Sequence, residues 1–189
     1  MPIQFDLETI RKKHNCKNYV ETGMWHPRDE TISLRKAMKS NFDKIYCIEI
    51  RDDFVELGLI YFSYDKRIKI INDDSCNLKQ HLQSNDFIDR TIFFLDAHVD
   101  NNNIKNYKYR CPLFEELNAI KSLDRKDNVI LIDDLRIIRN SYPWNENQYG
   151  DIDFLSNIKK LILDINPEYI FGYLDGIVEN DVLYAYINY

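Results

Sequence analysis

The C-terminal stretch Tyr169-Ile-Phe-Gly-Tyr-Leu-Asp-Gly-Ile-Val-Glu-Asn-Asp-Val-Leu-Tyr-Ala-Tyr-Ile187 decides the fold of this chain. It indicates two apolar strands, Tyr169–Leu174 and Val182–Ile187, joined by a short polar loop that contains Asp175-Gly176. Because this loop leaves no room for a helical crossover, the two strands must run antiparallel. The rest of the chain alternates between strand and helix patterns, which is typical of a parallel sheet with right-handed crossovers.

The alternation can be followed along the chain by its apolar periodicity and its capping residues. Strands are predicted over Lys17–Thr22, Lys44–Glu49, Arg67–Asn72, Thr91–Leu95 and Asn128–Ile132. Helices are predicted from Asp6 to about Lys13, over Glu30–Lys39 and Asp52–Phe62, from Ser75 to about Leu82, and over Pro112–Leu123 and Ile152–Asp164. The sequence therefore predicts an α/β fold, with a seven-stranded, mostly parallel sheet, helices on both faces and an antiparallel C-terminal strand.

Length and composition limit the class of protein. The chain has 189 residues, 44% of them hydrophobic and 13% aromatic, which predicts one packed domain over residues 1–189. The net charge of −6 argues against a nucleic-acid partner bound through a broad basic surface. No stretch approaches the ~20 apolar residues of a membrane-spanning helix, so no membrane partner is expected.

Neither the N-terminal residues nor the cysteines favour secretion. Residues Met1–Asp6 lack the basic and apolar segments of a secretory signal. The cysteines Cys16, Cys47, Cys76 and Cys111 are widely spaced and form no CxxC pair, so neither a zinc site nor a disulfide framework is expected. We therefore expect a reducing, cytoplasmic location.

Acidic residues follow two strongly apolar strands. Asp96 ends the run Thr91–Leu95, His98 lies two residues further on, and Asp133 and Asp134 follow Asn128–Ile132. Parallel strands place such residues at the carboxyl edge of the sheet, where open α/β folds bind ligands. Singly, the acid pair could cap a helix and the histidine could be structural. Together they favour an oxygen-rich site for a hard divalent cation.

A second set of residues follows the first three strands, in the order Glu21-Thr22-Gly23, Glu49 and Asp74-Ser75. A glycine after the first strand allows a sharp turn and a close ligand, and an acid after the second can accept hydrogen bonds from a ribose. The alternatives are an ordinary turn glycine, an exposed edge acid and a helix cap, and capping is the favoured use of Ser75.

Two polar loops begin at the same edge and could contact an acceptor. Val99–Arg110 ends in Tyr-Lys-Tyr-Arg, and Asn140–Asp151 carries Tyr142, Trp144 and Tyr149. Aromatic side chains on such loops can stack on a sugar or a ring, although they can also simply cover the core.

The order of these motifs resembles that of class I S-adenosylmethionine-dependent methyltransferases. The motifs are Glu21-Thr22-Gly23, Ile48-Glu49, Asp73-Asp74-Ser75, Phe94-Leu95-Asp96-Ala97-His98 and Leu131-Ile132-Asp133-Asp134. The similarity spans roughly Asn18 to Tyr186. Its Leu-Asp-Ala-His and Ile-Asp-Asp elements look like those of metal-dependent O-methyltransferases that modify sugar hydroxyls. The resemblance implies a Rossmann-like fold and a methyl transfer from S-adenosyl-L-methionine to a hydroxyl of a sugar or glycan.

The same resemblance implies roles for the singled-out residues. Asp96, Asp133 and Asp134 would hold Mg²⁺ or Mn²⁺, and His98 would act as the base. The implied cofactor-binding residues are Thr22 and Gly23 beside the methionine part, Glu49 on the ribose, Asp74 and Ser75 near the adenine, and also Glu21.

One feature departs from the family pattern, because the segment Gly23–Asp29 lacks the second glycine that the first loop usually has. The loop must therefore turn in another way. Two other classes of protein stay open: a metal-dependent nucleotide-sugar glycosyltransferase, and a non-catalytic binding module on a methyltransferase-like fold. A catechol-like diol stays open beside a sugar as the acceptor.

Overall fold

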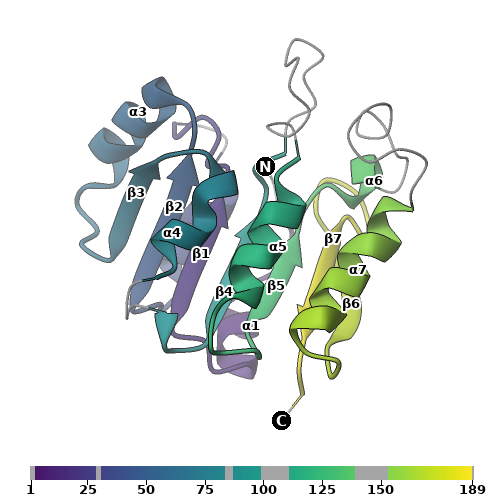
Figure 1. Cartoon of the computed structure of the whole chain (residues 1–189). Helices are drawn as coiled ribbons and strands as arrows, with labels where there is room; N and C mark the ends of the chain where they lie inside the picture. The colour runs from purple at the N-terminus through teal and green to yellow at the C-terminus, as the bar shows by residue number, and fades with distance from the viewer. Residues whose placement is uncertain (1–2, 29–30, 84–86, 99–110, 139–152, 189) are drawn as a thin grey trace.

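A computed structural model describes residues 3–28, 31–83, 87–98, 111–138 and 153–188. Its strands form one seven-stranded sheet in the order β3-β2-β1-β4-β5-β7-β6 (Figure 1). The strands are β1 Asn18–Thr22, β2 Lys44–Glu49, β3 Ile68–Asn72, β4 Thr91–Leu95, β5 Val129–Ile132, β6 Ile170–Leu174 and β7 Val182–Tyr186. Strands β1 to β5 pair in parallel, whereas β7 is antiparallel to both β5 and β6. The predicted fold class, including its antiparallel C-terminal strand, is confirmed.

The helices lie close to their predicted ranges. They are α1 Leu7–Lys13, α2 Ile32–Lys39, α3 Asp52–Phe62, the 3₁₀ turn η1 Ser75–Asn77, α4 Leu78–His81, α5 Leu113–Lys121, α6 Leu135–Ile138 and α7 Phe154–Ile165. The short α6 was not predicted, because four residues are too few to show a helical period. Among the described residues, no helix is both long and apolar enough to cross a membrane.

The sheet is covered on both faces. Alternate residues of β4 serve opposite cores, Phe93 and Leu95 on one face and Ile92 and Phe94 on the other. Helices α4, α5 and α7 pack on the first face, where Figure 1 shows α5 and α7 in front of the strands. Helices α1, α2 and α3 pack on the second face. With both faces filled, ligands can reach the sheet only at its edges and loops.

The register brings several strand ends to one level. Thr22 pairs with Leu95, and Leu95 pairs with Ile132, so the residues that follow β1, β4 and β5 emerge side by side. Strand β7 runs the other way and pairs Leu183 with Ile132, so its first residues lie at the same carboxyl edge. This edge therefore collects the residues after three parallel strands and those before one antiparallel strand.

Gly23 ends β1 at a point of close backbone contact. Its φ of +82° lies in the left-handed region, and a Cβ there would sit 2.4 Å from the carbonyl oxygen of Asp96. The Gly23 amide also donates to Ile48 O at 2.9 Å, and the Asp96 amide donates to Thr22 O at 3.0 Å. The glycine is thus required by the protein's own backbone, where β1 and β4 leave the sheet together.

Gly23→Ala should destabilise the protein strongly. The left-handed conformation costs a non-glycine residue about 1–2 kcal/mol, and the overlap with Asp96 adds to this, so we expect a total loss above ~2 kcal/mol in urea unfolding. Gly172→Ala in β6 is the matched control, because its added Cβ would meet Tyr184 at an ordinary 3.6 Å. Equal stability of Gly23→Ala and wild type would contradict this account.

Candidate functional site

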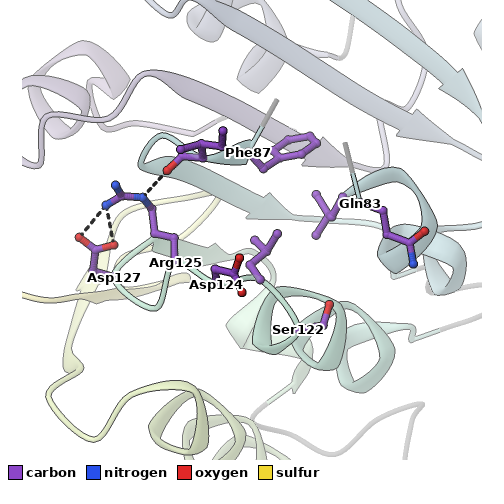
Figure 2. A pocket seen from close by; sticks show the side chains of 9 residues that line it. Gln83, Phe87, Ser122, Asp124, Arg125 and Asp127 are labelled. Atoms are coloured by element: carbon purple, nitrogen blue, oxygen red, sulfur yellow. Dashed lines mark hydrogen bonds and ion pairs between the residues drawn. The ribbon is translucent and has the colours of Figure 1, made fainter. Parts of the chain in front are cut away.

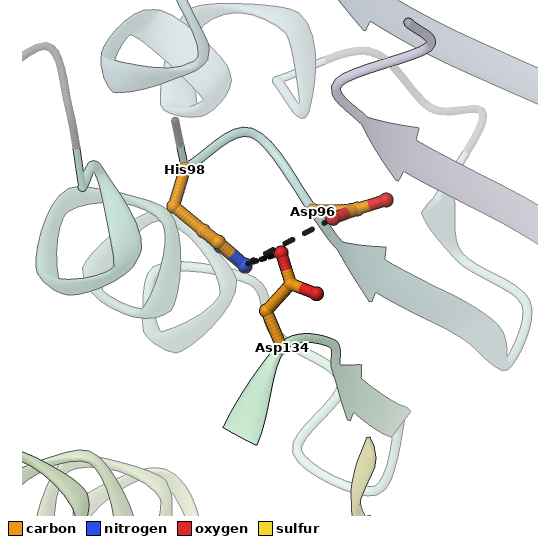
Figure 3. Close-up of side chains that lie close together, drawn as sticks. All are labelled: Asp96, His98 and Asp134. Carbon is orange, nitrogen blue, oxygen red and sulfur yellow. Dashed lines mark ion pairs between the residues drawn. The ribbon is translucent and has the colours of Figure 1, made fainter. Parts of the chain in front are cut away.

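Asp96, His98 and Asp134 come together at the carboxyl edge. Ligand atoms of the three side chains all lie within 4.8 Å of one another. The His98 Nε2 atom is 3.2 Å from Asp134 Oδ2 and 3.9 Å from Asp96 Oδ1, and Figure 3 shows the imidazole pointing at both carboxylates. All three side chains are almost completely buried. The structure therefore joins residues from the ends of β4 and β5, as the sequence predicted.

Asp133 belongs to a second, adjoining group with Asp134 and Asp181, whose ligand atoms again lie within 4.8 Å of one another. Asp133 Oδ1 accepts the Asp134 amide at 2.8 Å. A Cβ on Gly176 would lie 3.2 Å from both Asp133 Oδ1 and Asp181 Oδ2, so a larger residue there would crowd these carboxylates. We call Asp96, Asp133, Asp134 and Asp181 the acid corner.

Asp181 and Arg136 were missed by the sequence analysis. Asp181 immediately precedes β7, and an antiparallel strand begins at the edge where its parallel neighbours end, which is the signal that could have found it. Arg136 lies two residues after Asp134, and its guanidinium is 2.5 Å from Asp134 Oδ1 and also pairs with the Asp181 carboxylate. The sequence shows a cationic residue close to the acid pair, but it does not show that the Arg136 side chain points back toward Asp134 and Asp181.

Burial and mutual repulsion set the protonation of the acid corner. Burial raises the pKa of Asp96 well above its usual value, and the charges of Asp133 and Asp134 raise it further. Burial likewise raises the pKa of Asp133 to about 6, with Asp134 adding to the effect. Burial acts against Asp134 too, but its contacts with His98 and Arg136 hold the pKa of that carboxyl below its ordinary value. The positive charge around the acid corner is therefore too small to keep all of its carboxylates ionised.

The donor set fits a hard divalent cation. Asp96 Oδ1 is buried and accepts no hydrogen bond among the described residues, although a buried carboxylate oxygen without one is costly. Carboxylate oxygens are the ligands that Mg²⁺ and Mn²⁺ prefer. Asp96 and Asp134 offer such oxygens within one group, and Asp133 adjoins them through Asp134.

His98 is placed to exchange a proton at this site. Burial acts to lower the pKa of His98, but the hydrogen bond and charge of Asp134 outweigh it and leave the pKa raised. The imidazole is therefore stabilised as a cation while Asp134 faces it. A second cation bound to the Asp134 carboxylate would compete with His98 for its negative charge. It would thereby favour the neutral imidazole, which is the form that can accept a proton.

Glu49 organises the loop that lacks a second glycine. Its Oε2 accepts the amides of Met24 at 2.9 Å and Trp25 at 3.1 Å, and its Oε1 accepts the Arg51 amide at 2.9 Å. Trp25 takes the left-handed conformation, with φ +58°, that a glycine would otherwise supply. The Ile50 amide also acts on this carboxylate, so backbone amides take up most of its roughly four acceptor positions.

Glu21 and Thr22 face into the protein. The Glu21 carboxylate accepts hydrogen bonds from the hydroxyls of Tyr19 and Ser33, and burial raises its pKa to about 7. The Thr22 side chain is also fully buried, and its backbone carbonyl is bonded to Asp96. The carboxylate of Glu21 thus ties β1 to α2, and the predicted cofactor role of Glu21 stays a prediction.

Asp74 caps the turn after β3, whereas the sequence analysis favoured Ser75 for capping. Asp74 is the cap, since its Oδ1 accepts the Cys76 amide at 2.8 Å at the start of η1. Ser75 is buried. The turn after β3 is therefore built by Asp74, and Ser75 points toward the interior behind the edge.

Glu116, in the first turn of α5, is another buried acid that the sequence analysis missed. Its side chain is fully buried, and neither carboxylate oxygen has a hydrogen-bond partner of good geometry among the described residues. Burial raises the pKa of Glu116 to about 7, and the nearby hydroxyls of Thr22 and Ser75 and the imidazole of His98 act in the opposite direction. First-turn acids commonly complement the helix dipole in solvent, so the sequence carried no sign of this burial.

A surface cavity of about 480 Å³ lies elsewhere, among residues that precede β4 and β5. Figure 2 shows that Arg125 pairs with Asp127 on its wall. These residues are near the amino ends of the strands, so the cavity is separate from the acid corner. The predicted acceptor loops, Val99–Arg110 and Asn140–Asp151, lie entirely outside the described residues.

Comparison with known proteins gives a fold but no sequence family. No family model matches the chain, and no curated protein matches it either. An O-methyltransferase from Bacillus cereus, solved in complex with SAH, is similar in structure, with a TM-score of 0.60, 13% identity and coverage of 96% of this chain and 79% of that one. A putative caffeoyl-CoA O-methyltransferase from Staphylococcus aureus has a TM-score of 0.58, 14% identity and coverage of 96% and 81%.

These likenesses define a Rossmann-like methyltransferase fold for the chain. The same comparison finds spermidine synthase from Thermotoga maritima, with a TM-score of 0.52, 14% identity and coverage of 93% of this chain and 54% of that one. Since a protein named for another reaction shares the fold, the reaction must be argued from the site.

Glu116→Gln should change how stability depends on pH. The folded pKa of about 7 lies above the value near 4.3 expected for an unfolded glutamate, so folding binds a proton between these limits. This contribution to stability is lost as pH rises through that window. The glutamine variant, which has no carboxylate to ionise, should gain on the order of 2 kcal/mol relative to wild type between pH 5 and pH 8.

Urea unfolding at both pH values measures the effect of Glu116→Gln. Glu115→Gln, at the neighbouring and only partly buried position of α5, is the matched control and should show no such gain. A Glu116→Gln variant whose stability differs from wild type by the same amount at both pH values would refute the buried, proton-holding role.

Proposed function

We propose that this protein is a divalent-metal-dependent O-methyltransferase that moves a methyl group from S-adenosyl-L-methionine to a hydroxyl of a sugar or glycan. The observation that carries the proposal is the buried acid corner, with His98 beside it, at the carboxyl edge of a methyltransferase fold. Structural neighbours of the chain include O-methyltransferases, one of them solved with SAH. The sugar acceptor rests on the sequence resemblance.

The cofactor would lie along the ends of β1, β2 and β3. Glu49 would accept from the ribose hydroxyls, Thr22 and Gly23 would line the methionine part through their backbone, and Asp74 would border the adenine. When bound, S-adenosylmethionine supplies a methyl group on a positively charged sulfur. The contribution of the chain is to hold that group beside the acid corner and in line with the acceptor oxygen.

Asp96, Asp133 and Asp134 would hold Mg²⁺ or Mn²⁺. When bound, such an ion lowers the pKa of a hydroxyl that it contacts and fixes its direction. A divalent ion also supplies the positive charge that the buried carboxylates lack, which favours its retention.

His98 would accept the proton of the acceptor hydroxyl as the methyl group is transferred. Its Nε2 atom faces the acid corner, 3.2 Å from Asp134 Oδ2. For this role the imidazole must be neutral, and a cation held by Asp134 weakens the contact that otherwise keeps His98 protonated. The burial of His98 excludes bulk water, which would compete for the proton.

Calorimetry with S-adenosylhomocysteine tests the cofactor. We expect binding by the wild type, and at least tenfold weaker binding by Glu49→Gln, because the amide has fewer acceptor positions for both the loop and the ribose. Asp53→Asn, which changes an exposed acid in the first turn of α3, is the control and should bind as wild type. Binding of a nucleoside diphosphate sugar instead would indicate a glycosyltransferase, and binding of neither ligand a non-catalytic module.

Turnover with a panel of sugars that carry vicinal hydroxyls tests the metal and the base. We expect a chelator to abolish methyl transfer, Mg²⁺ or Mn²⁺ to restore it, and Asp133→Asn and His98→Ala to lower kcat by about 100-fold or more. Asp89→Asn, an exposed acid before β4, should leave kcat unchanged. The mechanism is wrong if folded Asp133→Asn and His98→Ala proteins both keep wild-type rates.

A further inference from the structure

Arg136 is fixed among the buried carboxylates by both its backbone and its side chain. It lies in α6, which starts directly after Asp134. Its amide donates to Asp181 Oδ1 at 2.9 Å, and its guanidinium contacts Asp181 Oδ2 and lies 2.5 Å from Asp134 Oδ1. The side chain of Arg136 is 27% exposed, whereas those of Asp134 and Asp181 are only 3% and 0% exposed. The positive charge is thus held at the mouth of the acid corner.

The two oxygens of Asp134 serve different cations. Oδ2 faces His98 at 3.2 Å, on the side of Asp96, and Oδ1 faces Arg136, on the side of Asp181. Asp134 is also the residue that the two groups of the acid corner share. The positive charge of Arg136 beside Oδ1 therefore acts directly on the Asp134 carboxylate, whose other oxygen is proposed to hold the metal ion.

The charge on Arg136 cannot be removed by titration. A guanidinium stays protonated at any pH that the protein experiences, unlike the imidazole of His98. It therefore neutralises part of the carboxylate charge permanently. It also fills the space between Asp134 and Asp181 in which a second cation would otherwise find three carboxylates.

We propose that Arg136 is a built-in counter-ion that fills the Asp133–Asp134–Asp181 group and lowers the affinity of the adjoining Asp96–Asp134 group for a divalent ion. This inference rests on the metal site of the proposed function. Arg136 acts through Asp134, so it is a positioning residue rather than a catalytic one. Weaker binding keeps the acid corner exchangeable, whereas four unopposed carboxylates would hold a divalent ion far more tightly.

Titration of the purified full chain with Mn²⁺ in a calorimeter, without cofactor or acceptor, tests this role. We expect R136M to bind Mn²⁺ at least tenfold more tightly than wild type, because a permanent positive charge beside Asp134 is lost. R136K keeps the charge and should stay within about threefold of wild type. R125M is the matched control: it breaks the pair with Asp127 before β5, at the other edge of the sheet, and should leave the affinity unchanged.

The double variant R136M/D181N guards against misfolding, because R136M alone leaves a buried carboxylate without its partner. It removes the positive charge of Arg136 and the negative charge of Asp181 together, and it keeps Asp96, Asp133 and Asp134. It too should therefore bind Mn²⁺ more tightly than wild type. Wild-type or weaker affinity in the folded variants would overturn the counter-ion role and leave the metal site standing. Absence of Mn²⁺ binding in wild type and all variants would overturn the metal site, and this inference with it.

Discussion

Mutual repulsion among four buried carboxylates is the constraint on which this site depends. Asp96, Asp133, Asp134 and Asp181 lie together with little solvent to separate their charges. His98 and Arg136 are the described cations in contact with them, and both contact Asp134. Burial first, and then the charges of the neighbouring acids, raise the pKa of Asp96 and of Asp133. Such a corner stores electrostatic energy that a bound cation would release.

The fold tolerates this repulsion because the edge is assembled from elements fixed elsewhere. Three strands that end at one level supply Gly23, Asp96 and Asp133, and their pairing is anchored in cores on both faces of the sheet. Unusual backbone conformations gather at the same edge, since Gly23, Trp25 and Asp134 all have positive φ. Local strain at an edge of this kind is sustained by the rigid sheet behind it.

Much of the fold could be predicted because its signals are local. The unbroken apolar runs Thr91–Leu95 and Val129–Ile132 are fully buried strands, and the closeness of the last two strands in sequence required an antiparallel pair. Asp96, His98 and Asp134 could be placed together because strand ends share an edge. The burial of Glu116 and the pairing of Arg136 with Asp181 could not be predicted, because each depends on packing between elements far apart in the chain.

By itself, the sequence determined the order of strands and helices, the antiparallel closing strand and the acids that follow β4 and β5, since periodicity and chain connectivity are properties of the chain. Only the tertiary structure decided how charge is distributed among these acids. It set Asp181 and Arg136 against Asp134, turned Glu21 inward toward Ser33 and gave the Glu49 carboxylate to the first loop. The reason is physical: ion pairs and hydrogen bonds act through space, over a few ångströms, between residues that the linear pattern does not relate.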